Sequence, residues 1–266
     1  MSLRQTIDAY CLKKLGRRPD IDSPSGYNDK IQWLKLFDQR PEHISACDKI
    51  AVREMVTEAA GSEFLIPTMD WPPKAFPVIA KASHDSGGNA VLRSDQDVLR
   101  AKSILEARMA RAYGIEKGEW AYQFIRPAII VEKLLPDQTD YKFHSAEGRI
   151  SWVQVIWNRA SGFPNEAIFT PDGEITDLHM DEKMRHMPDP AIHPGARAWS
   201  ALTDLALKLA EGWRYVRVDL YWSDDRPWFG ELTFWPRAGC YRSKDEPRFG
   251  ELMEIDMSYR FRPIVQ

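Results

Sequence analysis

Residues 215–239, YVRVDLYWSDDRPWFGELTFWPRAG, constrain the chain more than any other stretch, because they predict two neighbouring strands joined by a polar turn. The first strand alternates apolar residues on one face with Arg217 and Asp219 on the other. The second strand carries Glu231 and Thr233 on one face. If the two strands pair, the two carboxylates converge on one point with the arginine close by.

Two carboxylates beside an arginine are typical of a site for a hard cation such as Mg²⁺. That ion takes carboxylate oxygens and usually shares its remaining positions with phosphates. The alternative is an antiparallel hairpin whose polar face is simply solvated, which is a common arrangement. The pattern alone leaves both interpretations open.

The composition predicts one ordinary globular unit. The 266 residues are 44% hydrophobic and 28% charged, which suits one large domain or two coupled lobes. A net charge of -3 argues against non-specific nucleic-acid binding. Cys11, Cys47 and Cys240 lie far apart without a zinc-ligand pattern, so we expect reduced thiols in a cytoplasmic protein. We expect no signal peptide and no membrane insertion, because no apolar run approaches the roughly 20 residues that span a bilayer.

Residues 1–60 are predicted to be helical apart from a loop over 17–27, because their apolar residues recur at helical spacing. The second of these helices carries a charged edge formed by Asp48, Lys49 and Arg53. We interpret this edge as a solvated helix face.

After residue 64 the pattern changes to short apolar runs at 64–69, 78–82 and 90–93, which predict strands. The loop ASHDSGGN follows Lys81, and its small residues allow backbone N–H groups to approach phosphate oxygens. It is not a P-loop, because no GK[ST] follows, and a strand-to-strand loop argues against a Rossmann site. A two-glycine turn without any ligand is the alternative.

The segment AIIVEKLL, residues 128–135, predicts a buried strand interrupted by Glu132, whose carboxylate needs a partner. Residues 140–158 predict a hairpin that turns at Glu147-Gly148 and carries Asp140 and Lys142 on one strand face.

The order of these features resembles the ATP-grasp enzymes. The residues within the individual stretches resemble one branch, the TupA-like (teichuronopeptide-synthesis type) ATP-grasp proteins of bacterial surface-polysaccharide loci. Each matching stretch is short, but six occur in order over about residues 27–239. They are YNDKIQWLKLFD (27–38), DKIAVREMV (48–56), VIAKASHDSGGNAVL (78–92), RPAIIVEKLL (126–135), DYKF (140–143) and YVRVDLYW with FGELTFWPRAG (215–239).

The resemblance implies an α+β ATP-grasp fold with two lobes and the nucleotide between them. The helical N-terminal segment would cover residues 1–60, the smaller ATP-binding lobe 61–135 and the larger catalytic lobe 136–266. Many ATP-grasp enzymes carry a separate N-terminal α/β domain, and we expect none here because the chain is short.

The resemblance also implies a role for each matching position. Nucleotide contacts would come from Lys81 on the phosphates, the loop residues Ser86, Gly87 and Gly88, the adenine hinge Glu132, Lys133, Leu134 and Leu135, and Asp140 on the ribose. Asp219 and Glu231 would hold Mg²⁺. Arg217 would stabilise the transferring phosphoryl group, and Lys142 would contact the phosphates or the acyl substrate. Thr233 stands where related families commonly have Asn.

The implied reaction is amide formation by a carboxylate–amine ligase through an acyl phosphate, with ATP and Mg²⁺. The small-molecule partners would be a carboxylate and an amine, and the pathway setting suggests glycosyltransferase partners. Two alternatives remain open: an ATP-dependent kinase of a small molecule, and a non-catalytic nucleotide-binding partner of a glycosyltransferase.

Overall fold

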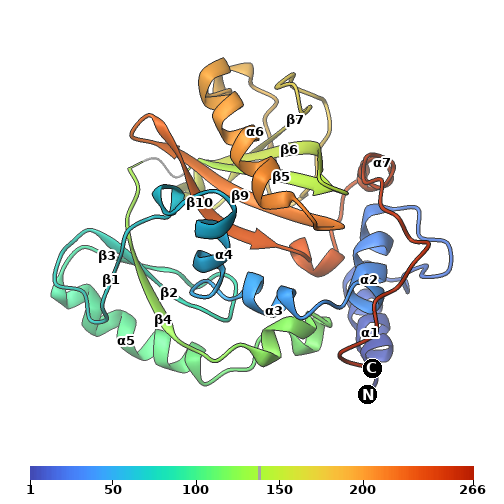
Figure 1. The fold of residues 1–266 in the computed structure, drawn as a ribbon, viewed down its shortest axis with the longest axis horizontal. Helices are drawn as coiled ribbons and strands as arrows, with labels where there is room; N and C mark the ends of the chain where they lie inside the picture. Colours follow the sequence, from blue (N-terminus) through green and yellow to red (C-terminus); the bar gives the residue numbers. More distant parts are fainter. Residues whose placement is uncertain (137–138) are drawn as a thin grey trace.

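The computed structural model describes residues 1–136 and 139–266 and contains two β-sheets with helices around them (Figure 1). One sheet has four strands in the order β1-β4-β2-β3, and the other has six in the order β10-β9-β5-β6-β7-β8. All neighbouring strands are antiparallel except β7 and β8. The predicted α+β class is therefore confirmed.

The six-stranded sheet consists of two tight hairpins and a shorter edge. Its strands are β5 (Asp140–Ala146), β6 (Arg149–Trp157), β7 (Asn165–Phe169), β8 (Arg185–His186), β9 (Tyr215–Ser223) and β10 (Arg226–Thr233). The β5–β6 turn places Glu147 and Gly148 at φ 49° and 73°, and the β9–β10 turn places Asp224 and Asp225 at φ 53° and 57°. Two consecutive positive φ angles match the twist of paired strands, so both predicted hairpins form.

Helix α6 (Ala196–Ala210) covers one face of this sheet. Its buried residues, Leu202 and Leu209 among them, join a core that contains Val216 and Val218 of β9. Side chains alternate across a strand, so packing Val216 and Val218 against the helix directs Arg217 to the opposite face. The alternation predicted from the sequence is the cause of the polar face described below.

The four-stranded sheet is built in the same way against a single helix. Its strands are β1 (Thr68–Met69), β2 (Val78–Ala82), β3 (Ala90–Leu92) and β4 (Ile129–Lys133), and α5 (Asp95–Met109) packs on one face. Ala80 of β2 is buried with Leu105 of α5. Lys81, the next residue of β2, therefore points away from α5.

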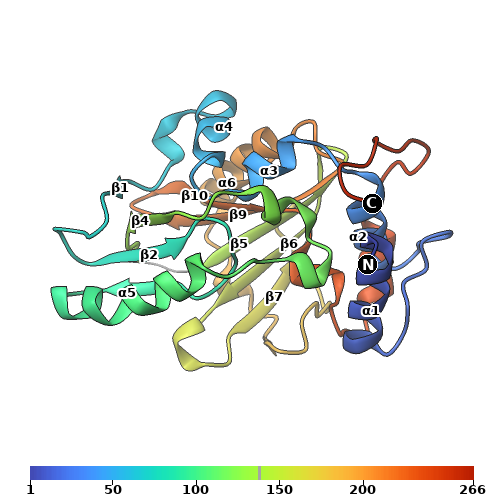
Figure 2. The same cartoon turned by 90° about the horizontal axis from the view of Figure 1, so that it is seen from below.

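The N-terminal helices are α1 (Leu3–Leu15), α2 (Tyr27–Phe37), α3 (Glu42–Cys47) and α4 (Val52–Ala59), within the region predicted to be helical. Figure 2 shows α1 and α2 side by side at one end of the molecule. Both belong to the core of the six-stranded sheet, and α2 also packs against the C-terminal helix α7 (Glu246–Leu252), which the sequence patterns did not predict.

Short 3₁₀ helices complete the described chain: η1 (Ser62–Phe64), η2 (Ile115–Lys117), η3 (Trp120–Phe124), η4 (Arg159–Ser161), η5 (Pro190–Ile192) and η6 (Pro236–Gly239). The strand predicted over 64–69 is reduced to β1, because η1 occupies its start and Pro67 has no N–H to donate to a ladder.

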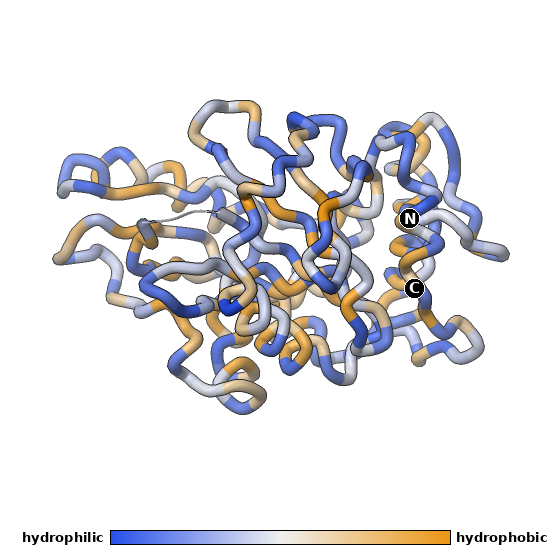
Figure 3. The backbone as a smooth tube through the Cα atoms, turned by 90° about the horizontal axis from the view of Figure 1, so that it is seen from above, coloured by the Kyte–Doolittle hydropathy of each residue, from blue (hydrophilic) through white to orange (hydrophobic). Residues whose placement is uncertain are grey.

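Apolar and polar stretches alternate along the backbone tube (Figure 3). Of the helices in residues 1–136 and 139–266, none is both long and apolar enough to cross a membrane.

Candidate active site

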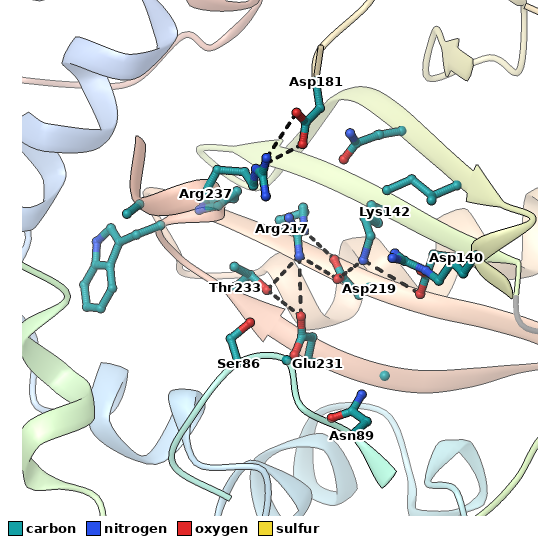
Figure 4. A pocket seen from close by; sticks show the side chains of 18 of the residues that line it. Ser86, Asn89, Asp140, Lys142, Asp181, Arg217, Asp219, Glu231, Thr233 and Arg237 are labelled. Carbon is teal, nitrogen blue, oxygen red and sulfur yellow. Dashed lines mark hydrogen bonds and ion pairs between the residues drawn. The ribbon is translucent and has the colours of Figure 1, made fainter. Parts of the chain in front are cut away.

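A cavity of about 790 Å³ is lined by residues of both sheets, within the usual size range of small-molecule sites. Lys81 of the four-stranded sheet and Asp219 of the six-stranded sheet both line it. Figure 4 shows Ser86 and Asn89 opposite the polar row of the larger sheet. The site residues expected from the sequence that line the cavity are Lys81, Ser86, Gly87, Glu132, Lys133, Leu134, Leu135, Asp140, Lys142, Arg217, Asp219 and Glu231.

Strand register alone brings four of the cavity residues into a row across the larger sheet. Glu231 of β10 is paired with Asp219 of β9, which is paired with Lys142 of β5, and Lys142 is paired with Gln154 of β6. Directly paired residues in antiparallel strands lie about 4.5–5.5 Å apart. The row therefore places two carboxylates, one ammonium group and one amide side by side in the cavity wall.

A β-bulge at Gly230 is what turns Glu231 toward this row. The register of β10 against β9 shifts by one residue here. Without the shift Glu231 would lie opposite Val218, on the apolar face. A side chain at Gly230 would place its Cβ 2.8 Å from the Asp219 carbonyl oxygen and 2.9 Å from the Tyr221 ring, so the bulge requires glycine.

Arg217, Asp219 and Lys142 form a buried charge cluster. The Arg217 guanidinium donates from Nε and Nη2 to the two Asp219 carboxylate oxygens, at 2.6 and 2.7 Å, and Lys142 forms an ion pair with the same carboxylate. Burial by itself would raise the pKa of Asp219, but the charges of Arg217 and Lys142 outweigh it and lower the pKa to about 2. With Asp219 only 2% exposed, the alternative of a merely solvated hairpin face is wrong.

Glu231 is the more accessible carboxylate of the pair. Its Oε1 accepts from the Thr233 hydroxyl at 3.2 Å and lies 3.4 Å from Arg217 Nη2. In the described part of the chain, no group of three or more His, Cys, Asp or Glu side chains is arranged to hold a metal ion. Asp219 and Glu231 offer two carboxylate groups, the kind of hard oxygen ligand that Mg²⁺ takes together with phosphate and water.

The opposite wall contains a second charged network, which corrects the interpretation of residues 48–53. Lys81 Nζ donates to Glu132 Oε2 at 2.6 Å, and Arg53 Nη1 lies 3.6 Å from Glu132 Oε1. Lys49 lines the cavity and donates to the carbonyl of Asp85. Lys49 lies in the turn between α3 and α4, not on a helix, and Arg53 lies on α4. The predicted solvated helix face is therefore wrong, because both side chains contact the smaller lobe.

The glycine-containing loop is held from behind by Arg108. Arg108 Nη2 donates to the carbonyls of Ser86 and Gly87 at 3.2 and 2.9 Å and forms an ion pair with Asp85 at 2.6 Å. A Cβ at Gly88 would meet the Arg108 guanidinium at 2.1 Å. Gly88 therefore turns toward Arg108 and is not among the cavity-lining residues, unlike Ser86 and Gly87, so the role expected for it beside the nucleotide is the least supported of the set.

The carbonyls of Lys133 and Leu134 in the hinge strand receive no hydrogen bond from the prolines that face them. The N–H groups of Lys133 and Leu134 donate to the carbonyls of Pro67 and Pro77, at 2.9 and 3.4 Å. Proline has no N–H, so neither partner can return a hydrogen bond to the carbonyls of Lys133 and Leu134. Both residues line the cavity. Acceptors at a strand end suit the exocyclic amine of a nucleobase.

Asp140, expected to contact the ribose, is already paired. Its carboxylate forms an ion pair with Arg159 of η4 and lies 3.8 Å from Lys142 Nζ. A ribose hydroxyl would have to share this carboxylate with Arg159, a residue that sequence reasoning missed.

Sequence reasoning also missed the end of the cavity nearest α1. Arg237 of η6 pairs through Nε with Asp181 at 3.0 Å (Figure 4), and both line the cavity. Glu119 forms part of the same wall and is 5% exposed, and Lys117 Nζ lies 3.9 Å from it. Arg237 lies within WPRAG, the end of the last stretch that resembles the family, and this was the one sequence signal for it.

Glu119 should make the stability of the protein depend on pH. Burial raises its pKa to about 7 from an ordinary value of 4.5, with Lys35 and Lys117 opposing the rise. The unfolded chain therefore loses this proton first, and stability falls as the pH rises from the lower value through the higher one, by up to about 3 kcal/mol. The free energy of unfolding of Glu119→Gln, measured with urea, should therefore rise relative to that of the wild type between about pH 5 and about pH 8.

Exposed Glu58 of α4 provides the control, because Glu58→Gln should keep a constant difference from the wild type at both pH values. A pH-independent difference for Glu119→Gln would contradict the raised pKa.

Two sheets that enclose a cavity lined by cations from both sheets agree with the ATP-grasp class expected from the sequence. The chain belongs to the TupA-like ATP-grasp family, whose model matches residues 29–253. Among curated proteins, no match to the sequence was found.

Several solved structures are similar to this chain. D-alanine–D-alanine ligase from Bacillus anthracis is 14% identical with a TM-score of 0.41, over 84% of this chain and 62% of that chain. L-amino acid ligase from Bacillus licheniformis is 12% identical with a TM-score of 0.45, over 84% and 47%. D-alanine–D-alanine ligase from Helicobacter pylori is 11% identical with a TM-score of 0.49, over 86% and 69%. The chain thus spans less than two thirds of the first two proteins.

Proposed function

We propose that the protein is an ATP- and Mg²⁺-dependent ligase that joins a carboxylate to an amine through an acyl phosphate. The observation that carries the proposal is the cavity with Lys81 on one wall and the Arg217–Asp219–Lys142 cluster on the other. Cations on two walls can hold a polyphosphate between them, and the carboxylates beside them suit its metal ion. We further infer a cytoplasmic enzyme of surface-polysaccharide synthesis, working alongside glycosyltransferases.

The nucleotide would lie with its base at the hinge and its phosphates at the cation cluster. Lys133 and Leu134 would meet the base through the carbonyls that Pro67 and Pro77 cannot engage. Lys81 would hold the phosphates beneath the loop that contains Ser86 and Gly87. These roles follow from family membership together with the geometry of the cavity.

The chain's own residues would act mainly by positioning and by electrostatics. The substrate carboxylate attacks the γ-phosphorus and ADP leaves. Arg217 and Lys142 lie where negative charge develops during this transfer. The amine nitrogen then attacks the acyl carbon, phosphate leaves, and the nitrogen loses a proton. Asp219 and Glu231 would hold Mg²⁺, which when bound offsets the phosphate charge.

A panel of carboxylates crossed with amines tests the proposal by ADP release, with mass spectrometry of the products. The expected result is ADP release that requires both substrates, and an amide product of matching mass. A stable phosphorylated product without an amide would overturn the ligase assignment in favour of a kinase. ATP binding without ADP release under any substrate pair would favour a non-catalytic role.

Lys81→Ala should chiefly weaken ATP binding. Losing one charge-assisted contact is expected to cost about 1.5–3 kcal/mol, which raises the Kd by roughly 10- to 150-fold. Calorimetric titration of ATP measures this directly. Lys74→Ala removes an exposed lysine from the same lobe and should bind ATP like the wild type. Equal affinity in both variants would remove Lys81 from the nucleotide site.

A further inference from the structure

Two of the three cysteines meet in the wall of the cavity, although 229 positions separate them in the sequence. Cys11 of α1 and Cys240, which directly follows η6, have their Sγ atoms 3.9 Å apart. Both are free thiols. A disulfide requires a separation of about 2.05 Å, so a shift of about 2 Å between the two elements would complete the bond.

The two thiols differ in access. Cys11 is 1% exposed, whereas Cys240 is partly exposed and lines the cavity. A small oxidant that enters the cavity therefore reaches Cys240 first, and Cys11 stands behind it. This is the usual arrangement of an attacked thiol next to a resolving one.

The charges around the pair favour a thiolate at Cys240. A hydrogen bond from the Cys11 thiol lowers the pKa of Cys240, burial opposes this, and Lys35 and Lys14 lower it further. The same hydrogen bond and burial raise the pKa of Cys11. Because the thiolate is the reactive form, the accessible sulfur is also the activated one.

We propose that Cys11 and Cys240 form an oxidation site, a dithiol in the cavity wall that peroxides convert to a disulfide. The Cys240 thiolate attacks one peroxide oxygen and expels hydroxide, which gives a sulfenic acid. The Cys11 sulfur then attacks the Cys240 sulfur, expels the bound oxygen as water and forms the S–S bond. In total, two thiols lose two hydrogens and one hydrogen peroxide becomes two waters.

A Cys11–Cys240 disulfide would alter the cavity because Cys240 directly follows residues that are hydrogen-bonded to α2. Gln32 Nε2 donates to the carbonyls of Ala238 and Gly239 at 2.9 and 2.8 Å, and Lys35 Nζ donates to the Ala238 carbonyl at 2.8 Å. Movement of Cys240 toward α1 would strain these hydrogen bonds, which hold the segment beside the cavity-lining Arg237. The consequence for turnover rests on the proposed function, whereas formation of the bond does not.

The test is hydrogen peroxide treatment of the whole wild-type protein, followed by intact mass and non-reducing peptide mapping. We expect a loss of two hydrogens, one peptide pair linking Cys11 to Cys240, and full reversal by dithiothreitol. Cys47→Ala should form the same link, because buried Cys47 takes no part. Cys11→Ser should stop at a sulfenic acid on Cys240, trapped by dimedone.

An unchanged mass after peroxide, or dimedone labelling of Cys47 in place of Cys240, would overturn the proposal. Once a substrate pair is known, oxidation should lower ADP release at least about fivefold and dithiothreitol should restore it. A link that forms without any change in ADP release would leave the oxidation site standing and remove its influence on the cavity. Absence of ADP release from every reduced sample would count against the ligase assignment alone.

Discussion

Replacing Asp219 with Asn should reduce Mg²⁺-dependent ADP release by roughly 10²–10³-fold. The change keeps the shape of the side chain but removes the charge that faces both Arg217 and Lys142. It also replaces one of the two anionic oxygen ligands that we propose for Mg²⁺ with a neutral amide oxygen. Steady-state ADP release across a range of Mg²⁺ concentrations measures the loss, and higher Mg²⁺ should not restore it.

The same substitution leaves two buried cations without their counter-ion, so some loss of stability must be separated from the loss of activity. Breaking a buried ion pair by removing one partner typically costs about 3–5 kcal/mol. Activity should therefore be measured well below the Tm of the variant, with circular dichroism as the check on folding. Asp225→Asn, at the exposed turn of the same hairpin, is the matched control and should retain normal turnover. Near-normal ADP release from a folded Asp219→Asn protein would end its assignment as a metal ligand.

The hairpin at the centre of the site was predictable because its information is local. Alternation along β9 fixes which residues share a face, and two polar turn residues fix where the strand reverses. The position of Glu231 was less secure, because it depends on the extra residue Gly230. A glycine within a strand pattern permits a bulge but does not require one.

Residues whose neighbours come from distant parts of the chain were not predictable by local pattern. The local pattern of Lys49 and Arg53 resembles a solvated helix edge, but their side chains contact Asp85 and Glu132 of the smaller lobe. Glu119 follows a glycine in a connecting segment, and nothing nearby in the sequence marks it as buried. Gly88 shows the reverse case, since its place in the loop pattern suggested a ligand contact while Arg108 occupies the space beside it. In each case the deciding contact is tertiary.

Arg217→Lys should lower kcat by roughly 10²–10³-fold with a smaller effect on KM for ATP. The guanidinium binds both oxygens of Asp219 and still reaches Thr233 at 3.1 Å and Glu231 at 3.4 Å. Lysine keeps the positive charge but cannot form this planar fork, so it cannot hold the carboxylates and a transferring phosphoryl group together. The expected loss therefore falls on the transition state more than on the bound nucleotide.

Steady-state kinetics combined with calorimetric titration of ATP separates these two effects. Arg226→Lys is the matched control, because Arg226 stacks on Trp228 at the other end of the hairpin, 4.0 Å from the ring centroid, and takes no part in the charge cluster. It should leave kcat and ATP affinity unchanged. If Arg217→Lys bound ATP poorly yet turned over normally at saturating ATP, Arg217 would be a ground-state phosphate ligand, and stabilisation of the developing charge would have to come from Lys142.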